Sequence, residues 1–184
     1  MKHKRIWILT LSVMVLLLVG VGATLAFLLS STDALTNRFL PSQAGCRVME
    51  ERFDGVSKQN VTVQNTGNVD AYMRVSVVCN FLDEDGNVVG VIPHLGLDYT
   101  LACNTADWFL CGGFYYCKRS VAPGENAPVL FTQCDVLETD AAKAYRLNMD
   151  FAAQCIQANP AKAVESAWKT VTVAADGTLT EVTE

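Results

Sequence analysis

Apolar and polar residues alternate along much of the chain after position 37. The clearest stretch covers residues 71–81, where every odd-numbered position is apolar and most even-numbered positions are polar. Residues 147–155 and the shorter stretch 61–64 repeat the alternation. A period of two predicts a β-strand with one buried face. These three stretches are therefore predicted strands, with the odd-numbered side chains of 71–81 facing a core.

Turn-forming residues divide the chain into hairpins. Residues 108–117 (WFLCGGFYYC) carry aromatic side chains on both sides of Gly112-Gly113, a pattern that favours a tight two-residue turn. The cluster DEDGN at 83–87 predicts another turn, followed by a second strand at 88–92. A turn at 121–125 precedes a predicted strand at 129–136, and residues 170–182 predict a final hairpin.

One helix is predicted near the C-terminus. Asn159 suits the N-cap, Pro160 suits the first turn, and residues 161–168 (AKAVESAW) are good helix formers. With eight or nine short strands and frequent turns, the predicted fold class is mainly β. We expect a jelly-roll or Ig-like β-sandwich.

The first 29 residues have a different pattern. A basic start (MKHKR) precedes a long uncharged apolar run, and the next charge is Asp33. Thr24 and Ala26 are small residues at the −3 and −1 positions of a cut between Ala26 and Phe27, which is typical of a signal peptide. The alternative is an uncut transmembrane helix, which needs about 20 apolar residues. In either case the basic cluster keeps the start inside the cell, and the body lies outside.

This reading divides the chain into three parts. Residues 1–26 are the signal peptide or uncut helix, residues 27–42 an extended segment, and residues 43–184 the β-sandwich domain. The net charge is −5, and Lys2, Lys4 and Arg5 all belong to the head, so the body is more acidic still. An acidic body excludes the basic face that a nucleic-acid binder needs.

The chain contains seven cysteines, and in an exported protein this number predicts disulfides. The odd count leaves at least one thiol unpaired. The candidates are Cys46, Cys79, Cys103, Cys111, Cys117, Cys134 and Cys155.

The sequence suggests three groupings of these cysteines and does not decide among them. Cys79 and Cys155 lie on the apolar faces of their strands, so they are either a disulfide between two sheets or two buried free thiols. Cys46 with Cys134 is a further candidate pair. The cysteines at 103, 111 and 117 crowd one hairpin region and predict a local bridge. Sequence alone does not fix the connectivity.

No residue pattern for catalysis or cofactor binding stands out. His94 is the one histidine after the basic head, and the chain has no H-E-x-x-H, G-x-S-x-G or C-x-x-C motif. Residues 83–87 offer carboxylates for calcium, but the EF-hand positions for Gly and Glu hold Val88 and His94. We therefore expect no enzyme, no metal site and no cofactor.

Three stretches resemble a known group of exported proteins. They are GATLAFLLSSTDALTNRF at 22–39, VTVQNTGNVDAYMRVSVV at 61–78 and YYCKRSVAPGE at 115–125. The first is similar to the signal peptide and mature start in SipW-type signal peptide-containing proteins of Gram-positive bacteria, the TasA/camelysin-like family. The second is similar to a strand pair of the same group, and the third to a later element of its small clostridial members.

The resemblance implies an exported, non-enzymatic structural protein of the cell surface or biofilm matrix. A SipW-type signal peptidase would be one partner, and copies of the chain or other matrix proteins would be others. The chain would contact the membrane only through its N-terminal helix. In the TasA branch, the segment after the cut completes the sheet of the next subunit in a fibre; the corresponding donor here is 27–39. The alternatives are a camelysin-like surface metalloprotease, for which no ligand set is found, and a membrane-tethered extracellular binding module.

Overall fold

The computed structural model describes residues 3–4, 6–8, 10–17, 41–53 and 57–182. The chain divides into two compact units, Met1–Leu40 and Pro41–Glu184. In the first unit the described residues are helical, and their large apolar side chains are more than half exposed. None of the helices in the described part of the chain is both long and apolar enough to cross a membrane.

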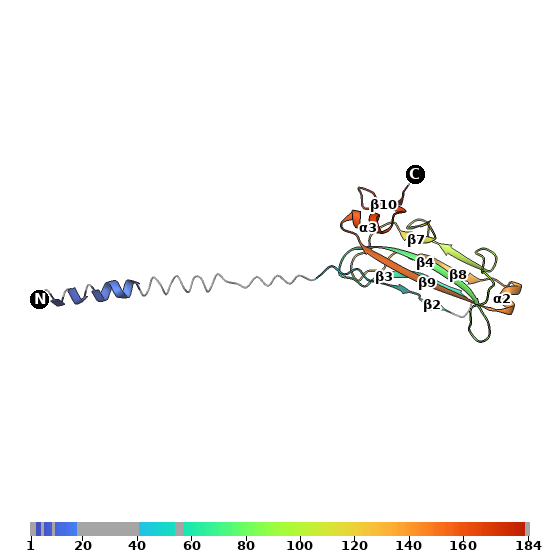
Figure 1. Ribbon diagram of the computed structural model, residues 1–184, viewed down its shortest axis with the longest axis horizontal. Coiled ribbons are helices and arrows are strands. Elements are labelled where there is room, and N and C mark those ends of the chain that lie inside the picture. Colours follow the sequence, from blue (N-terminus) through green and yellow to red (C-terminus); the bar gives the residue numbers. More distant parts are fainter. Residues whose placement is uncertain (1–2, 5, 9, 18–40, 54–56, 183–184) are drawn as a thin grey trace. The chain divides into compact units, whose positions relative to one another are not determined.

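The second unit is mainly β, and its sheets are antiparallel. The first sheet has the strand order β1-β3-β8-β5, and β2 also pairs with β3. Its strands are β1 Cys46–Met49, β2 Arg52–Phe53, β3 Ser57–Asn65, β5 Tyr99–Cys103 and β8 Phe131–Val136. The second sheet has the order β6-β7-β4-β9. Its strands are β4 Ala71–Leu82, β6 Trp108–Cys111, β7 Phe114–Cys117 and β9 Arg146–Gln157. Figure 1 shows both sheets.

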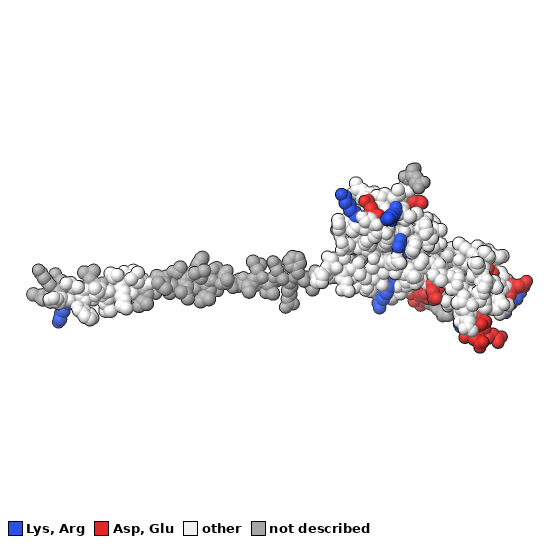
Figure 2. Space-filling view, in the orientation of Figure 1, with Lys and Arg blue, Asp and Glu red and all other residues white. Residues whose placement is uncertain are grey.

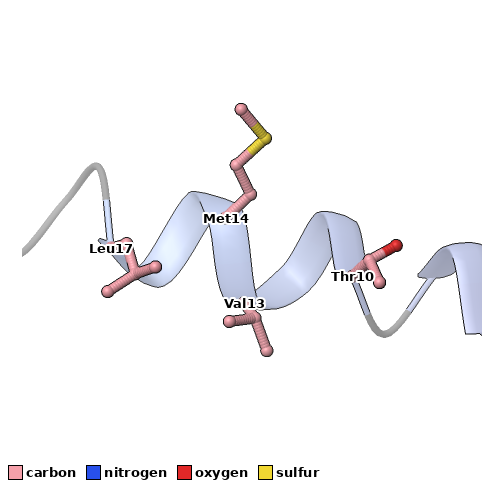
Figure 3. Close-up of a pocket in the computed structure, with 4 residues that line it drawn as sticks. All are labelled: Thr10, Val13, Met14 and Leu17. Carbon is pink, nitrogen blue, oxygen red and sulfur yellow. The ribbon is translucent and has the colours of Figure 1, made fainter.

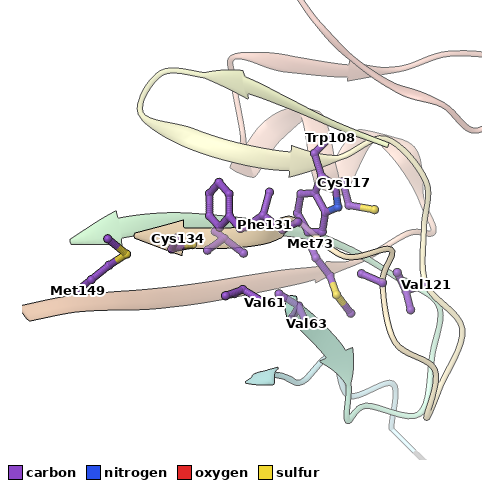
Figure 4. Packing of buried hydrophobic residues seen from close by; sticks show 12 residues of the cluster. Val61, Val63, Met73, Trp108, Cys117, Val121, Phe131, Cys134 and Met149 are labelled. Carbon is purple, nitrogen blue, oxygen red and sulfur yellow. The ribbon is translucent and has the colours of Figure 1, made fainter. Parts of the chain in front are cut away.

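The two sheets share one hydrophobic core. Val61 and Val63 from β3 and Phe131 from β8 pack with Met73 from β4 and with Trp108, all of them fully buried (Figure 4). The indole Nε1–H of Trp108 donates to the carbonyl of Pro128 at 3.0 Å. The large ring is therefore buried with its polar atom satisfied.

The predicted strands at 61–64, 71–81 and 147–155 are confirmed as parts of β3, β4 and β9. β4 and β9 pair along their whole length, from Ala71↔Gln157 to Leu82↔Arg146. Met73, Val75, Val77 and Cys79 of β4 pack in or against the main core, as the alternation predicted. The predicted hairpin at 108–117 also forms, with Gly112 at φ 56° and Gly113 at φ 81°.

The other face of β4 is also covered. α3 (Ala161–Ala167) and the small hairpin of β10 (Val171–Val173) and β11 (Leu179–Glu181) pack there around a second cluster (Figure 1). Its buried residues are Tyr72, Cys111, Tyr116, Val164, Trp168, Val171 and Leu179. The hydroxyl of Tyr72 donates to the carbonyl of Gly177 at 2.6 Å.

Two local predictions are corrected by the structure. The turn at 83–87 forms, but no strand follows at 88–92; Val88 makes a single bridge to Leu82. The N-cap of α3 is Pro160 rather than Asn159, and no side chain caps it. A second short helix, α2 (Asp140–Ala144), was not predicted; Thr139 Oγ1 caps it by accepting from Ala142 N–H at 3.2 Å.

Candidate functional site

The seven cysteines are all free thiols in this structure, and the strand registers separate most of the predicted pairs. Cys79 lies opposite Met149 and Cys155 lies opposite Met73 in the β4–β9 ladder. The two cysteines are thus about 20 Å apart along one pair of strands, at about 3.3 Å per residue. They lie in one sheet, so the predicted cross-sheet pair is not brought together.

The pair of Cys46 with Cys134 is separated in the same way. Cys46 lies opposite Asn65 and Cys134 lies opposite Lys58, at opposite ends of β3. At the same rise per residue, about 23 Å of strand separates them.

The three cysteines at 103, 111 and 117 do not meet either. Cys103 belongs to β5 of the first sheet, whereas Cys111 and Cys117 stand at opposite ends of the β6–β7 hairpin in the second. Cys111 Sγ contacts Glu181 Oε1 at 3.3 Å instead. Cys117 is buried in the main core, and burial raises the pKa of its thiol to about 11.

A different pair of thiols is brought together. Cys46 starts β1, which contacts β9, and both Cys46 and Cys155 of β9 pack against the main core. Burial, and next the Cys155 thiol, raise the pKa of Cys46 to about 12. The periodicity of the sequence placed Cys155 on an inner face but gave no signal for this partner, because it does not reveal how β1 lies against β9.

The free edge of β9 is the longest sheet edge in the second unit. β9 has 12 residues, whereas β1, β5 and β6 at the other edges have 4, 5 and 4. On its side away from β4, β9 has no hydrogen-bonded strand among residues 41–53 and 57–182, although β1 of the first sheet contacts β9. An edge of this kind presents backbone N–H and C=O groups that can pair with an added strand.

An apolar loop joins β4 to β5 at the end of the domain that carries α2. Its side chains are unusually exposed; Ile92 has 73% and Val88 65% of its surface accessible. The exposed apolar residues of the loop are Val88, Val91, Ile92, Leu95 and Leu97. Acidic atoms gather at the same end (Figure 2). An exposed apolar patch beside acidic groups suits a contact with another molecule.

His94 lies within this loop, and its main chain anchors the loop to Asp98. The His94 N–H donates to Asp98 Oδ2 at 2.9 Å, and the Thr139 hydroxyl donates to Asp98 Oδ1 at 2.8 Å. These two bonds lower the pKa of the Asp98 carboxyl. In the region that the structure describes, no three His, Cys, Asp or Glu side chains gather as metal ligands would. Asp83, in the predicted turn at 83–87, accepts from Asn87 N–H at 2.8 Å and so closes that turn.

Arg74 occupies an aromatic setting on the outer face of β4. Its guanidinium carbon lies 4.0 Å from the ring centre of Phe114 and 4.9 Å from that of Trp168. Its Nε donates to Gln154 Oε1 at 2.8 Å, and its Nη1 donates to the Tyr116 hydroxyl at 3.0 Å. Arg74 therefore joins the strands β4, β7 and β9 to the segment that follows α3. Its partners are neutral, so the residue has a packing role in this arrangement.

The predicted cleavage site and donor segment lie outside the described residues; this applies to Ala26, Phe27 and the segment 27–39. In the N-terminal unit, Thr10, Val13, Met14 and Leu17 line a shallow apolar hollow along the helix (Figure 3). The Thr10 hydroxyl bonds back to the carbonyls of Ile6 and Trp7, at 3.2 and 3.0 Å. A hydroxyl satisfied within its own helix is compatible with apolar surroundings.

No known protein family, characterised protein or solved structure matches this chain. The resemblance stated above therefore rests on the quoted residues alone.

Proposed function

We propose that the chain is an exported structural protein of the bacterial cell surface or biofilm matrix, related to the SipW-type, TasA/camelysin-like proteins. In this proposal a SipW-type signal peptidase cuts between Ala26 and Phe27. The domain is a jelly-roll or Ig-like β-sandwich, and copies of it associate when the segment 27–39 of one copy pairs with a sheet edge of the next.

The observation that carries the proposal is the long free edge of β9. A strand of 12 residues can accept a segment of similar length, and residues 27–39 supply one between the proposed cut and the domain. Strand addition gains main-chain hydrogen bonds along the edge, while alternate side chains provide specificity. The apolar residues available for this are Phe27, Leu28, Leu29, Leu35, Phe39 and Leu40.

The start of the domain is held close to one end of β9. Asn68 donates from Nδ2 to the carbonyl of Pro41 at 3.0 Å, and its Oδ1 accepts from Gln43 N–H at 2.7 Å. Ser42 and Gln157 line the same small polar hollow. The donor segment would therefore leave the domain beside the end of an acceptor strand, and either its own copy or a neighbouring copy could receive it. Only pairing with a neighbour builds a chain of subunits.

Assembly of the mature chain tests the proposal. Mature protein starting at Phe27 is compared by sedimentation velocity and electron microscopy with the double variant Leu35→Asp, Phe39→Asp. We expect concentration-dependent oligomers or fibres from the wild type and monomers from the variant, since charges on one face of the donor would have to be buried. Thr36→Asp changes the opposite face and is the matched control. A wild type that stays monomeric at every concentration and pH would contradict the proposal.

A second candidate is a membrane-tethered binding module, favoured by the exposed apolar loop at 88–97. Here the N-terminal helix is not cut, and the loop contacts a partner outside the cell. The body would then be found only in membrane fractions. Casein cleavage that a chelator abolishes would instead establish the camelysin-like protease, which no cluster of side chains in the described part of the chain supports.

A further inference from the structure

We propose that Cys46 and Cys155 form a disulfide bond that joins the edges of the two sheets. Cys46 begins β1, the edge strand of the first sheet, and Cys155 lies on β9, the edge strand of the second. Both side chains are partly buried and pack against the shared core. The bond would link β1 to β9 where the two strands contact.

The two thiols are neighbours in the fold. β1 contacts β9, both side chains pack against the same core, and the Cys155 thiol is close enough to raise the pKa of Cys46. A disulfide would bring the two sulfur atoms to about 2.05 Å. The other candidate pairs Cys79–Cys155 and Cys46–Cys134 are separated by strand register, and Cys111 contacts Glu181 instead.

Both cysteines are carried by well-fixed backbone. Cys46 is in register with Asn65 of β3, and just before it the Gly45 carbonyl accepts from Thr66 N–H at 2.9 Å. A Cβ on Gly45 would lie 2.9 Å from Thr66 Oγ1, which shows how closely the chain is held there. Cys155 lies within the continuous β4–β9 ladder, opposite Met73. The pair is therefore positioned by two separate ladders rather than by a loop.

The bond would have a specific structural effect. β1 has four residues and pairs only with β3 in its sheet, whereas Cys155 belongs to the longest ladder of the domain. A disulfide here closes a loop of about 110 residues, and long loops restrict the unfolded chain most. It would also fix the point at which the donor segment leaves the domain, and in this respect the inference deepens the proposed function.

The reaction is a two-electron oxidation. Both S–H bonds break, one S–S bond forms, and two protons leave. The disulfide of an extracytoplasmic thiol oxidoreductase takes up the two electrons and becomes a dithiol; oxidised glutathione can take this part in vitro. Since burial keeps the Cys46 thiol protonated in the folded state, the bond forms fastest before β1 docks.

Thiol mapping of the full-length protein tests the inference. The chain is refolded in detergent with a mixture of oxidised and reduced glutathione, unfolded without reductant, alkylated, digested and analysed by mass spectrometry. We expect one linked peptide pair containing Cys46 and Cys155, and an intact mass about 2 Da below that of the reduced chain. Alkylation of both residues, or a link of either to another cysteine such as Cys79 or Cys134, would overturn the proposal.

Thermal unfolding supplies the second readout. Reduction should lower the melting temperature of the wild type by on the order of 10 °C. Cys103→Ser, which changes a half-buried thiol of β5, should keep this drop, whereas Cys46→Ser and Cys155→Ser should lose it. An equal effect of reductant on all four proteins would contradict the bond. Neither readout depends on export or on assembly, so this inference and the proposed function can fail separately.

Discussion

The side-chain amide of Asn65 donates from Nδ2 to the carbonyl of Val121 at 2.8 Å in the fully buried interior of the second unit. The same Nδ2 donates to the carbonyl of Val69 at 2.9 Å, and Oδ1 accepts from Gly67 N–H at 2.9 Å. Asn65 therefore joins the turn between β3 and β4 to the chain that follows β7. Asn65 begins the sequence NTGN at 65–68, within the stretch 61–78 that resembles the exported group, and its role here is structural and needs no ligand.

Replacement of Asn65 by Ala should destabilise the domain strongly. It removes three hydrogen bonds. The Val121 carbonyl keeps the Ala71 N–H, but the Val69 carbonyl and the Gly67 N–H lose their partner, and each buried unsatisfied group costs about 1–3 kcal/mol. We expect a loss of about 3 kcal/mol in the free energy of unfolding, measured by urea denaturation. Asn148→Ala, which removes one bond to the exposed carboxylate of Asp150, should cost under about 1 kcal/mol. Equal losses in the two variants would contradict this account.

Arg74 should hold the segment that follows α3 against β4. Arg74→Ala removes the stacking on Phe114 and Trp168 and two hydrogen bonds, so we expect a loss of about 2 kcal/mol. Faster proteolysis should begin after residue 158, and the near-ultraviolet circular dichroism of Trp168 should weaken. Arg74→Lys keeps the charge but lacks the planar group. If Arg74→Lys were as stable as the wild type, the positive charge rather than the stacking of the planar group would account for the stabilisation.

The carboxylate of Asp98 should make stability depend on pH. The N–H of His94 and then the hydroxyl of Thr139 lower its pKa in the folded state. This stabilisation is present above the unfolded pKa, near 4, and is lost as the pH falls through the lower folded value. In urea denaturation from pH 7 to pH 2, the difference between the wild type and Asp98→Asn should therefore shrink towards the acid end. Two parallel curves would show that protonation of Asp98 does not contribute to the pH dependence of the free energy of unfolding.

The turn between β6 and β7 depends on positive φ angles. Gly113 has φ +81° and nothing within 4 Å of a Cβ built on it, so a substitution there introduces backbone strain without a clash. Gly113→Ala should lower the free energy of unfolding by about 1–2 kcal/mol. Gly90 has the same open space without a positive φ, so Gly90→Ala is the matched control and should be close to neutral. A neutral Gly113→Ala would contradict the turn conformation.

The strands that the sequence predicted best are those with one buried face. Met73 and Val75 alternate with more polar neighbours because their side chains enter the core, and periodicity reports that directly. The second face of β4 was missed, because Tyr72 and Arg74 have polar ends and are covered by distant parts of the chain that include Trp168. The prediction for residues 88–92 was wrong in the opposite sense. Their apolar side chains suggested a strand, yet within the described part of the chain their only ladder contact is the bridge of Val88 to Leu82.

The candidate site was less predictable than the fold. The seven cysteines could be named, but their pairing depends on register, and a shift of a few residues changes every neighbour. Cys46 and Cys155 come together because β1 lies beside β9, which no local pattern encodes. The free edge of β9 likewise follows from strand order rather than from the residues of β9.

The central claim is that the chain is exported and cut, which makes residues 27–39 available as a donor strand. The most direct test is the intact mass and N-terminal sequence of the protein recovered from the culture fluid and surface of a Gram-positive host with a SipW-type signal peptidase. We expect a chain that begins at Phe27, and loss of this product when the peptidase is removed. A chain that still begins at Met1 and is found only with membranes would contradict the claim.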